Sequence, residues 1–341
     1  MFPHKITKVS PGTNERLMSH FGCDSDGFVQ VGDQKWIFPA EYARHASGFY
    51  QFQHSSDDVW IMTFPRSGTT LCQELVWLLK NNLDFKKSAE IHLDRRAPFF
   101  EFNIICGQKF VQDVLDLNNH DPASIEHLNY LVTPRYKTWD GLISPRIIKT
   151  HLPFCLLSPS LLSASKVVYV ARNPKDVLIS YYHLCKLLKY DHFNYRGDLK
   201  TFWQFFKEDL VCWGPYWEHI KQAWDQRHHP NMLFIFYENL MRDMFSEVKT
   251  IAKFLNVKYS DEDLQQLVDH LEINNFRQKV PCTAPEVIKG ISEDGRRLEF
   301  IRRGKTNGGD PELIPELSRE IDEWIEANLQ DTDFRFPVES H

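Results

Sequence analysis

The sequence lacks the features that mark membrane, secreted and zinc-binding chains. It contains no apolar run of about eighteen residues, so no transmembrane helix is predicted. Its seven cysteines are scattered with no Cys-x-x-Cys pair, which argues against a zinc site and for reduced thiols in the cytosol. The first residues, Met-Phe-Pro-His-Lys-Ile, contain no long apolar core, so we expect no signal peptide.

An excess of positive charge is also missing. The formal net charge is −6, which disfavours broad binding to nucleic acid or to an anionic membrane. Internal repeats and low-complexity tracts are absent as well. Hydrophobic residues make up 42% and charged residues 25% of the 341 residues, enough for a sizeable core. We expect an N-terminal extension, residues 1–45, packed on one main domain, residues 46–341.

The most informative stretch is residues 59–79. An apolar run ends in a Pro/Gly turn, and two threonines then open a helical pattern, which predicts a strand, a tight loop and a helix N-terminus. Such a terminus favours an anion, and Gly68 lets the backbone approach a phosphate. The side chains of Arg66, Ser67, Thr69 and Thr70 can each donate a hydrogen bond to it. The loop is P-loop-like but lacks the Gly-Lys pair of nucleotide hydrolases, and an ordinary capped turn is the alternative.

A second anion site is indicated at Arg172. Residues 166–171 form an unbroken β-rich run, typical of a buried parallel strand. The run ends in Arg172, where a nucleotide hydrolase would need an aspartate for magnesium. A helix should follow, with Asn173 as N-cap, and Ser180 lies two turns into it. The alternative is a surface arginine and a neutral helical serine.

A reaction centre is indicated between these two sites. Residues 146–152 read as a short strand, ended by Pro153, that places Lys149 and His151 on one face. Lys149 can neutralise developing charge, and His151 can accept a proton near neutral pH. The chain has fifteen histidines, and a lone histidine is more often structural than catalytic.

The alternation of strands and helices predicts an α/β fold in a single domain, with a central parallel sheet flanked by helices. Ligands are expected at the carboxyl ends of the strands. A further strand is predicted at residues 233–236, and helices at residues 246–255, 261–271 and 316–329. Residues 278–300 lack clear periodicity and are expected to form a loop that closes over a cofactor.

Taken in order, these motifs resemble those of one family. Pro-Arg-Ser-Gly-Thr-Thr, Lys-Thr-His-Leu-Pro, Ala-Arg-Asn-Pro-Lys-Asp-Val, Phe-Tyr-Glu-Asn-Leu and Phe-Ile-Arg-Arg-Gly are similar to those of the cytosolic sulfotransferases. The resemblance spans about residues 36–335. It extends to arthropod members, including retinol-dehydrating ones.

The resemblance implies transfer of a sulfonate from 3′-phosphoadenosine 5′-phosphosulfate (PAPS) to a hydroxyl or amine, without a metal. His151 would be the general base, with Lys149 and Arg66 at the transferring sulfonate. The implied cofactor-binding residues are Arg66, Ser67, Gly68, Thr69, Thr70, Leu71, Arg172, Ser180, Tyr237, Ile273, Ile301, Arg302, Arg303 and Gly304. The implied acceptor pocket contains Phe99, Phe102 and Trp213, together with Lys149 and His151.

The sequence departs from the family pattern at four places. Arg66 replaces a usual lysine and keeps the charge as a planar fork. Leu71 replaces a usual tryptophan and Ile273 a frequent phenylalanine, so adenine stacking would be weaker or aliphatic. The short family dimer motif is not visible, since residues 307–311 read Asn-Gly-Gly-Asp-Pro. Homodimerisation by that route is left open.

Several functions remain as hypotheses at this stage. The first is sulfonation of a small apolar hydroxyl compound such as a phenol, flavonoid, steroid or isoprenoid alcohol. The second is PAPS-dependent dehydration of an allylic alcohol such as retinol. The third is a PAPS-binding protein with little transfer activity, and the fourth is a nucleotide kinase or hydrolase, which magnesium-independent turnover would exclude. A cytoplasmic enzyme without nucleic-acid or membrane partners is expected.

Overall fold

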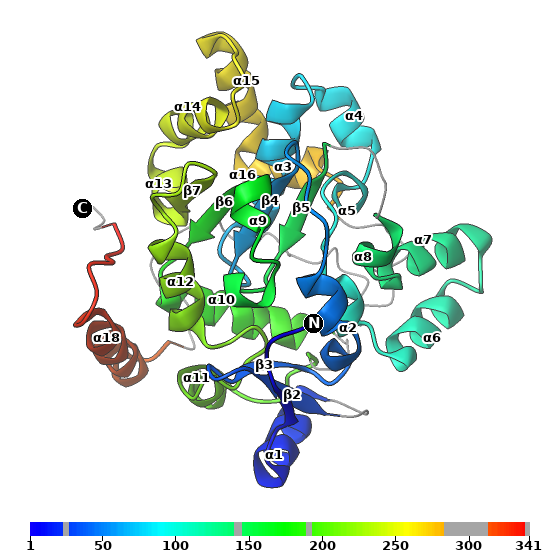
Figure 1. Cartoon of the computed structure of the whole chain (residues 1–341), viewed down its shortest axis with the longest axis vertical. Helices are drawn as coiled ribbons and strands as arrows, with labels where there is room; N and C mark the ends of the chain where they lie inside the picture. Colours follow the sequence, from blue (N-terminus) through cyan, green and yellow to red (C-terminus); the bar gives the residue numbers. More distant parts are fainter. Residues whose placement is uncertain (23–26, 140–144, 189–192, 283–312, 338–341) are drawn as a thin grey trace.

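The computed structural model describes residues 1–22, 27–139, 145–188, 193–282 and 313–337. Its centre is a four-stranded parallel sheet with the strand order β5-β4-β6-β7 (Figure 1). The strands are β4 (Val59–Thr63), β5 (Ile147–Thr150), β6 (Lys166–Ala171) and β7 (Met232–Phe236). The sheet confirms the predicted α/β class and each of the predicted strands.

Both faces of this sheet are covered, which explains the unbroken apolar runs. In β4, Trp60 and Met62 belong to one hydrophobic cluster, while Val59 and Ile61 belong to a second. Alternate residues of a strand point to opposite faces, so the two clusters lie on the two sides of the sheet. Every residue of β4 is therefore buried.

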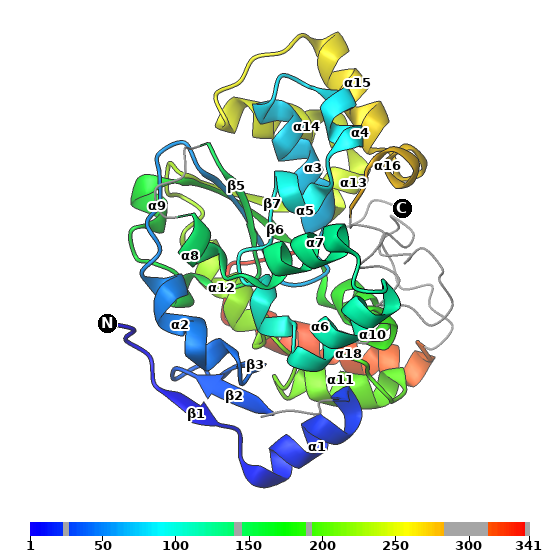
Figure 2. The same cartoon turned by 90° about the vertical axis from the view of Figure 1, so that its right-hand side faces the viewer.

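Helices form the two outer layers. The face with Val59 and Ile61 is covered by α3 (Thr69–Lys80), α5 (Leu93–Arg96), α13 (Tyr237–Arg242), α14 (Met244–Phe254), α15 (Asp261–Leu271) and α16 (Ile273–Lys279). The face with Trp60 and Met62 packs against α10 (Pro174–Leu187), α11 (Leu199–Lys207), α12 (Tyr216–Asp225) and α18 (Pro315–Leu329). In Figure 2 the first group lies above the sheet and the second below it.

Further helices lie outside these two groups. They are α4 (Phe85–Glu90), η1 (Phe102–Ile105), α6 (Gln108–Leu117), α7 (Pro122–Val132), α8 (Arg135–Thr138), η2 (Phe154–Leu156) and α9 (Leu161–Ala164). The helices α6 and α7 lie at the edge of the molecule, away from the central sheet (Figure 1).

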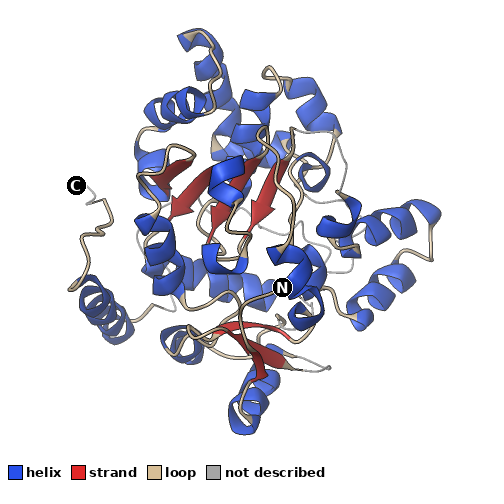
Figure 3. Cartoon of the chain, in the orientation of Figure 1, coloured by secondary structure: helices blue, strands red, loops and turns tan. Residues whose placement is uncertain are grey.

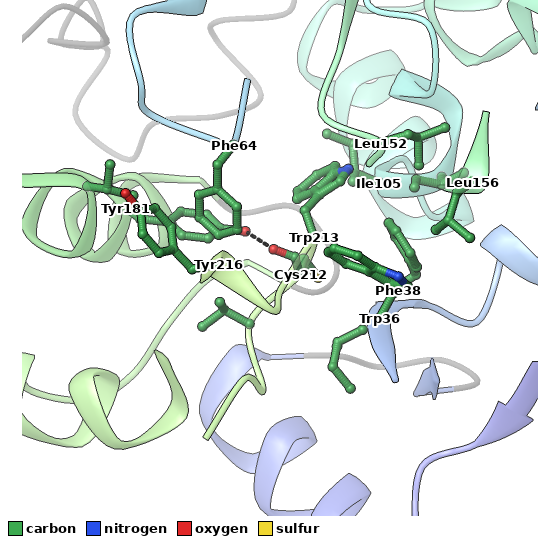
Figure 4. Packing of buried hydrophobic residues seen from close by; sticks show 14 of the residues in the cluster. Trp36, Phe38, Phe64, Ile105, Leu152, Leu156, Tyr181, Cys212, Trp213 and Tyr216 are labelled. Carbon is green, nitrogen blue, oxygen red and sulfur yellow. Dashed lines mark hydrogen bonds between the residues drawn. The ribbon is translucent and has the colours of Figure 1, made fainter. Parts of the chain in front are cut away.

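The N-terminal residues build a second, antiparallel sheet with the order β1-β2-β3 (Figure 3). Its elements are β1 (Ile6–Lys8), α1 (Pro11–Phe21), β2 (Phe28–Val31) and β3 (Trp36–Pro39), followed by α2 (Tyr42–Tyr50). Trp36 and Phe38 are fully buried and pack in one cluster with Leu156 and Trp213 (Figure 4). Residues 1–45 thus share the main core, while a domain boundary near residue 45 stays a prediction.

The predicted helices are present, with shifted ends. The helix after the phosphate loop begins at Thr69, the first of the two threonines that open the predicted pattern, whereas α14 begins at Met244 rather than at Ser246. The predicted closing loop lies mostly outside the described residues. Within the described part of the chain, no helix is both long and apolar enough to cross a bilayer.

Candidate active site

The carboxyl ends of the four parallel strands carry predicted site residues. The phosphate loop follows β4, His151 follows β5, Arg172 follows β6 and Tyr237 follows β7. Parallel strands present these ends at one edge of the sheet, so four segments far apart in sequence meet there.

The phosphate loop has the backbone geometry expected of an anion cradle. Gly68 is the N-cap of α3 with φ 99°, and Arg66 also has a positive φ of 70°. A Cβ atom at position 68 would lie 2.6 Å from Cδ2 of Tyr237, so only glycine fits beneath this ring. Thr69 Oγ1 lies 2.6 Å from Thr63 Oγ1, which ties the helix start to the end of β4.

The two predicted anion sites adjoin each other. Arg66 Nε donates to Ser180 Oγ at 2.9 Å, and Arg172 Nη1 donates to the Arg66 carbonyl at 3.0 Å. The Arg172 guanidinium carbon stands 4.3 Å from the ring centroid of Tyr237, and Asp176 lies 3.7 Å from Nη2. The structure therefore brings the P-loop-like turn and the Arg172–Ser180 helix into one cationic corner.

Unsatisfied polar atoms in this corner fit a phosphorylated ligand. Ser67 Oγ and Arg172 Nε are buried and have no hydrogen-bond partner among the described residues. Burying a donor without a partner costs about 1–3 kcal/mol, so a bound phosphate oxygen would relieve that cost. The free N–H groups at the start of α3 add to the attraction.

His151 is held in one tautomer. Its Nδ1 lies 2.8 Å from the carbonyl oxygen of Thr63 and 3.2 Å from Thr63 Oγ1. A carbonyl oxygen can only accept, so Nδ1 carries the proton and Nε2 keeps its lone pair. Burial, with Lys149 nearby, holds the pKa of His151 well below its usual value. The ring is therefore neutral at physiological pH and able to accept a proton at Nε2.

Lys149 shares an aromatic neighbour with His151. Phe99 forms a β-bridge with Lys149, and its ring centroid lies 4.3 Å from Lys149 Nζ and 5.0 Å from the His151 ring. Burial lowers the pKa of Lys149 to about 8, with Glu101 opposing this shift and Arg66 adding to it. A charged amine is thus retained at neutral pH beside the candidate base.

The predicted acceptor walls surround this pair. Trp213 packs 5.6 Å from the His151 ring and 6.2 Å from Phe99, and Phe102 packs 5.9 Å from Phe99. Trp213 is itself fixed by the N-terminal sheet, because its N–H donates to the Ile37 carbonyl at 3.0 Å. Flat apolar surfaces of this kind suit a small hydrophobic molecule.

Glu101 is a site residue that the sequence analysis missed. Its buried carboxylate accepts from the His151 N–H at 2.7 Å, from Thr150 Oγ1 at 2.8 Å and from Trp213 Nε1 at 3.2 Å. Burial raises its pKa to about 7, against the effect of the bonds from His151 and Thr150 and of the Lys149 charge. The available signal was a lone carboxylate inside the apolar run Phe-Phe-Glu-Phe.

Some predicted residues contribute less to this geometry. Thr70 and Leu71 lie half-buried in the first turn of α3, and Leu71 packs against the second hydrophobic cluster. Ile273 begins α16 and is half-buried. The predicted cofactor residues Ile301, Arg302, Arg303 and Gly304, and the site of the missing dimer motif, lie outside the described residues.

Comparisons with known proteins identify the family of this chain. A family profile described as a sulfotransferase domain matches residues 56–333. The luciferin sulfotransferase of Photinus pyralis is 31% identical over 317 residues, covering 90% of this chain and 81% of that protein. Sulfotransferase 1E1 of Homo sapiens is 28% identical over 305 residues, covering 88% of this chain and 92% of that protein.

A solved structure is similar over nearly the whole chain. Retinol dehydratase in a complex with retinol and PAP is 31% identical, with a TM-score of 0.88, and the match covers 98% of this chain and 99% of that one. The family profile and these relatives extend well beyond half of the chain. The chain is therefore an enzyme of the sulfotransferase family, as its motifs predict.

Proposed function

We propose that the enzyme moves a sulfonate from PAPS to the hydroxyl of a small apolar acceptor, with His151 as the general base. The observation that carries the proposal is the neutral His151 ring, anchored through Nδ1 and bracketed by Phe99 and Trp213 beside Lys149. Two solved neighbours are complexes with PAP, the desulfonated product of PAPS, which supports the identity of the donor.

The residues of the cationic corner would hold the donor. Arg66, Ser67 and the N-terminus of α3 would bind its 5′-phosphosulfate, and Arg172 and Ser180 its 3′-phosphate. Tyr237, above Gly68 and beside Arg172, would contact the adenosine. PAPS, when bound, supplies the sulfonate and leaves as PAP.

The remaining residues would act on the acceptor. His151 Nε2 would take the hydroxyl proton, while Lys149 would stabilise the negative charge that grows on the sulfonate oxygens. Phe99, Phe102 and Trp213 would hold an apolar body with its hydroxyl toward Nε2 and exclude water from the reacting atoms. This arrangement favours phenols, flavonoids, steroids or isoprenoid alcohols over glycans.

Dehydration of an allylic alcohol is a second candidate. It is favoured by the similarity, at a TM-score of 0.88, to a retinol dehydratase solved with retinol and PAP. An allylic sulfate ester can lose its sulfate and a proton, so the net result is loss of water.

Mass spectrometry after incubation with PAPS and a panel of acceptors tests both candidates. We expect a sulfate adduct on a simple phenol, and either an adduct or a loss of water on an allylic alcohol. Activity on glycans together with none on any small phenol or alcohol would overturn the pocket argument. Release of PAP with no change in any acceptor would contradict transfer itself.

The cellular setting is proposed on separate grounds. The described cysteines form no disulfide with one another; they are Cys72, Cys106, Cys155, Cys185, Cys212 and Cys282. Cysteines that stay reduced are typical of a reducing compartment, so we place the enzyme in the cytoplasm. We expect the small acceptor as its binding partner, and we expect it to bind neither nucleic acid nor a membrane.

A further inference from the structure

A second histidine lies behind the candidate base. His219, on α12, is 1% exposed, and its Nε2 lies 2.9 Å from the carbonyl oxygen of His151. On the other side of the ring, Nδ1 lies 2.7 Å from the hydroxyl of Tyr169 on β6. His219 thus links the centre of the sheet to the residue that follows β5.

The hydrogen positions in this chain follow from chemistry. The His151 carbonyl can only accept, so His219 carries its proton on Nε2. His219 Nδ1 is then an acceptor, and the Tyr169 hydroxyl, 2.7 Å away, donates to it in preference to the His219 carbonyl, which lies 3.3 Å away. Burial lowers the pKa of His219 to about 4, so this neutral arrangement persists across the physiological range.

Together with Glu101, this bond fixes both backbone groups of His151. Glu101 holds the N–H at 2.7 Å, and His219 holds the carbonyl at 2.9 Å. Thr63 holds ring atom Nδ1 at 2.8 Å. Three bonds from three different segments therefore set the direction of Nε2, the one polar atom of His151 without a partner among the described residues.

We propose that His219 is a positioning residue that orients His151 for proton transfer, with Tyr169 selecting its tautomer. The inference rests on the proposed function, because it needs His151 to be the base. A displacement of about 1 Å at a reacting group can cost roughly 100-fold in rate, so a bond that fixes the base affects turnover more than binding.

The competing explanation is packing alone. The centroid of the His219 ring also lies 5.7 Å from that of Phe64 and 6.1 Å from that of Trp36. A small residue at position 219 would therefore disturb the core. His219→Leu keeps the bulk but removes the donor, whereas His219→Gln keeps an N–H near the position of Nε2. If only packing matters, the two variants should behave alike.

The experiment measures kcat, acceptor KM and the PAP dissociation constant for both variants. We expect His219→Leu to lower kcat by about 10- to 100-fold, with KM and PAP binding within about twofold, and His219→Gln to recover most of the rate. In the His151→Ala background, His219→Leu should cause almost no further loss, because it acts through His151. Equal rates for the Leu and Gln variants would overturn the proposal.

A second pair of variants, each of which removes a single hydroxyl group, tests the proposal if His219→Leu does not fold. Tyr169→Phe removes only the hydroxyl that donates to His219, and we expect kcat to fall by about two- to tenfold, the value of one hydrogen bond. Tyr195→Phe is the control, since this tyrosine is 4% exposed and its hydroxyl donates, in a part-buried bond, to the Asp198 carbonyl at 3.2 Å, in the segment between α10 and α11. Equal rates in the two Phe variants would also contradict the proposal.

The outcomes separate this inference from the proposed function. Full turnover in His151→Ala would remove the base itself, whatever the His219 variants do. An inactive His151→Ala together with wild-type kcat in His219→Leu would overturn the role of His219 alone.

Discussion

At the scale of single residues, burial sets which groups around His151 are charged. It holds the pKa of His151 well below its usual value and lowers that of Lys149 to about 8. At pH 7 the histidine is therefore neutral and the lysine mostly cationic, the pair of states that proton abstraction and charge stabilisation need. As pH rises through about 8, Lys149 loses its proton while His151 does not change.

The first prediction concerns this alkaline limb. In the wild-type enzyme, kcat/KM should fall about tenfold between pH 7 and pH 9, since the charged fraction of Lys149 falls by about the same factor around its pKa of about 8. Lys149→Arg keeps the charge, so its limb should move to higher pH even where its maximal rate is lower. An aliphatic alcohol is the suitable acceptor, because its hydroxyl does not titrate in this range. Lys166→Arg is the control. If kcat/KM falls at the same pH in Lys149→Arg and Lys166→Arg, the alkaline limb does not report Lys149.

The second prediction concerns Glu101. Its negative charge raises the pKa of Lys149, so Glu101→Gln should move the alkaline limb of kcat/KM to lower pH. The amide can still accept from the His151 N–H and from Trp213, so the geometry should survive. In the Lys149→Arg background the limb should not move. A shift that persists there would assign the limb to another group.

At the scale of elements, the site depends on where strands end and helices begin. Asn173 caps α10 as predicted, since its side chain accepts from the Lys175 N–H. The loop from Arg66 to Gly68 places two residues at positive φ before α3. These local features depend on nearby sequence, so residue types alone indicate them.

The third prediction tests the phosphate loop. Gly68→Ala adds a Cβ atom 2.6 Å from the Tyr237 ring at a φ of 99°, so the loop or the ring must shift. This shift changes the shape of the phosphate cradle, and PAP affinity measured by calorimetry should weaken by about tenfold, or 1.4 kcal/mol. Gly12→Ala, where a Cβ atom would meet nothing within 4 Å, should not change it. Unchanged affinity in Gly68→Ala would count against this loop as the cofactor cradle.

Contacts between segments that are far apart along the chain could not be predicted from the sequence. The strands, the loop glycine and the Lys149–His151 pair follow from local patterns, and the structure has them. The bond between Arg66 and Ser180 joins positions 114 apart, and that between His219 and His151 positions 68 apart. No local pattern encodes such pairs, so nothing in the sequence marks Glu101, in an apolar run, or His219, in a mixed polar and apolar helix, as a site residue.

At the scale of the whole molecule, the N-terminal sheet and the central parallel sheet share one core. The Ile37 N–H donates to the Gly214 carbonyl at 3.1 Å, and the Trp213 N–H donates back to the Ile37 carbonyl at 3.0 Å. Trp213, a wall of the proposed acceptor pocket, is thus supported by a strand far away in sequence. Figure 4 shows Trp213 between Trp36 and Ile105, and the hydroxyl of Tyr181 bonded to the carbonyl of Cys212.

The fourth prediction follows from this single core. A ligand that binds only the native state raises the free energy of unfolding by about 2.7 kcal/mol at 100 times its dissociation constant. PAP should therefore raise the midpoint of thermal unfolding, with or without EDTA. Arg172→Ala should weaken PAP binding by about 1.5–3 kcal/mol and so remove most of that rise at the same PAP concentration. A rise that EDTA abolishes, or that Arg172→Ala preserves, would contradict the proposed donor site.

The central claim is that His151 removes the acceptor proton during sulfonate transfer. The most direct measurement compares wild type and His151→Ala in single-turnover transfer of labelled sulfonate from PAPS to a simple phenol, together with calorimetric PAP binding. Loss of a positioned base should lower the transfer rate by about 10²–10⁴-fold, while the PAP dissociation constant stays within about twofold. Transfer at close to the wild-type rate in His151→Ala, with intact PAP binding, would contradict the account.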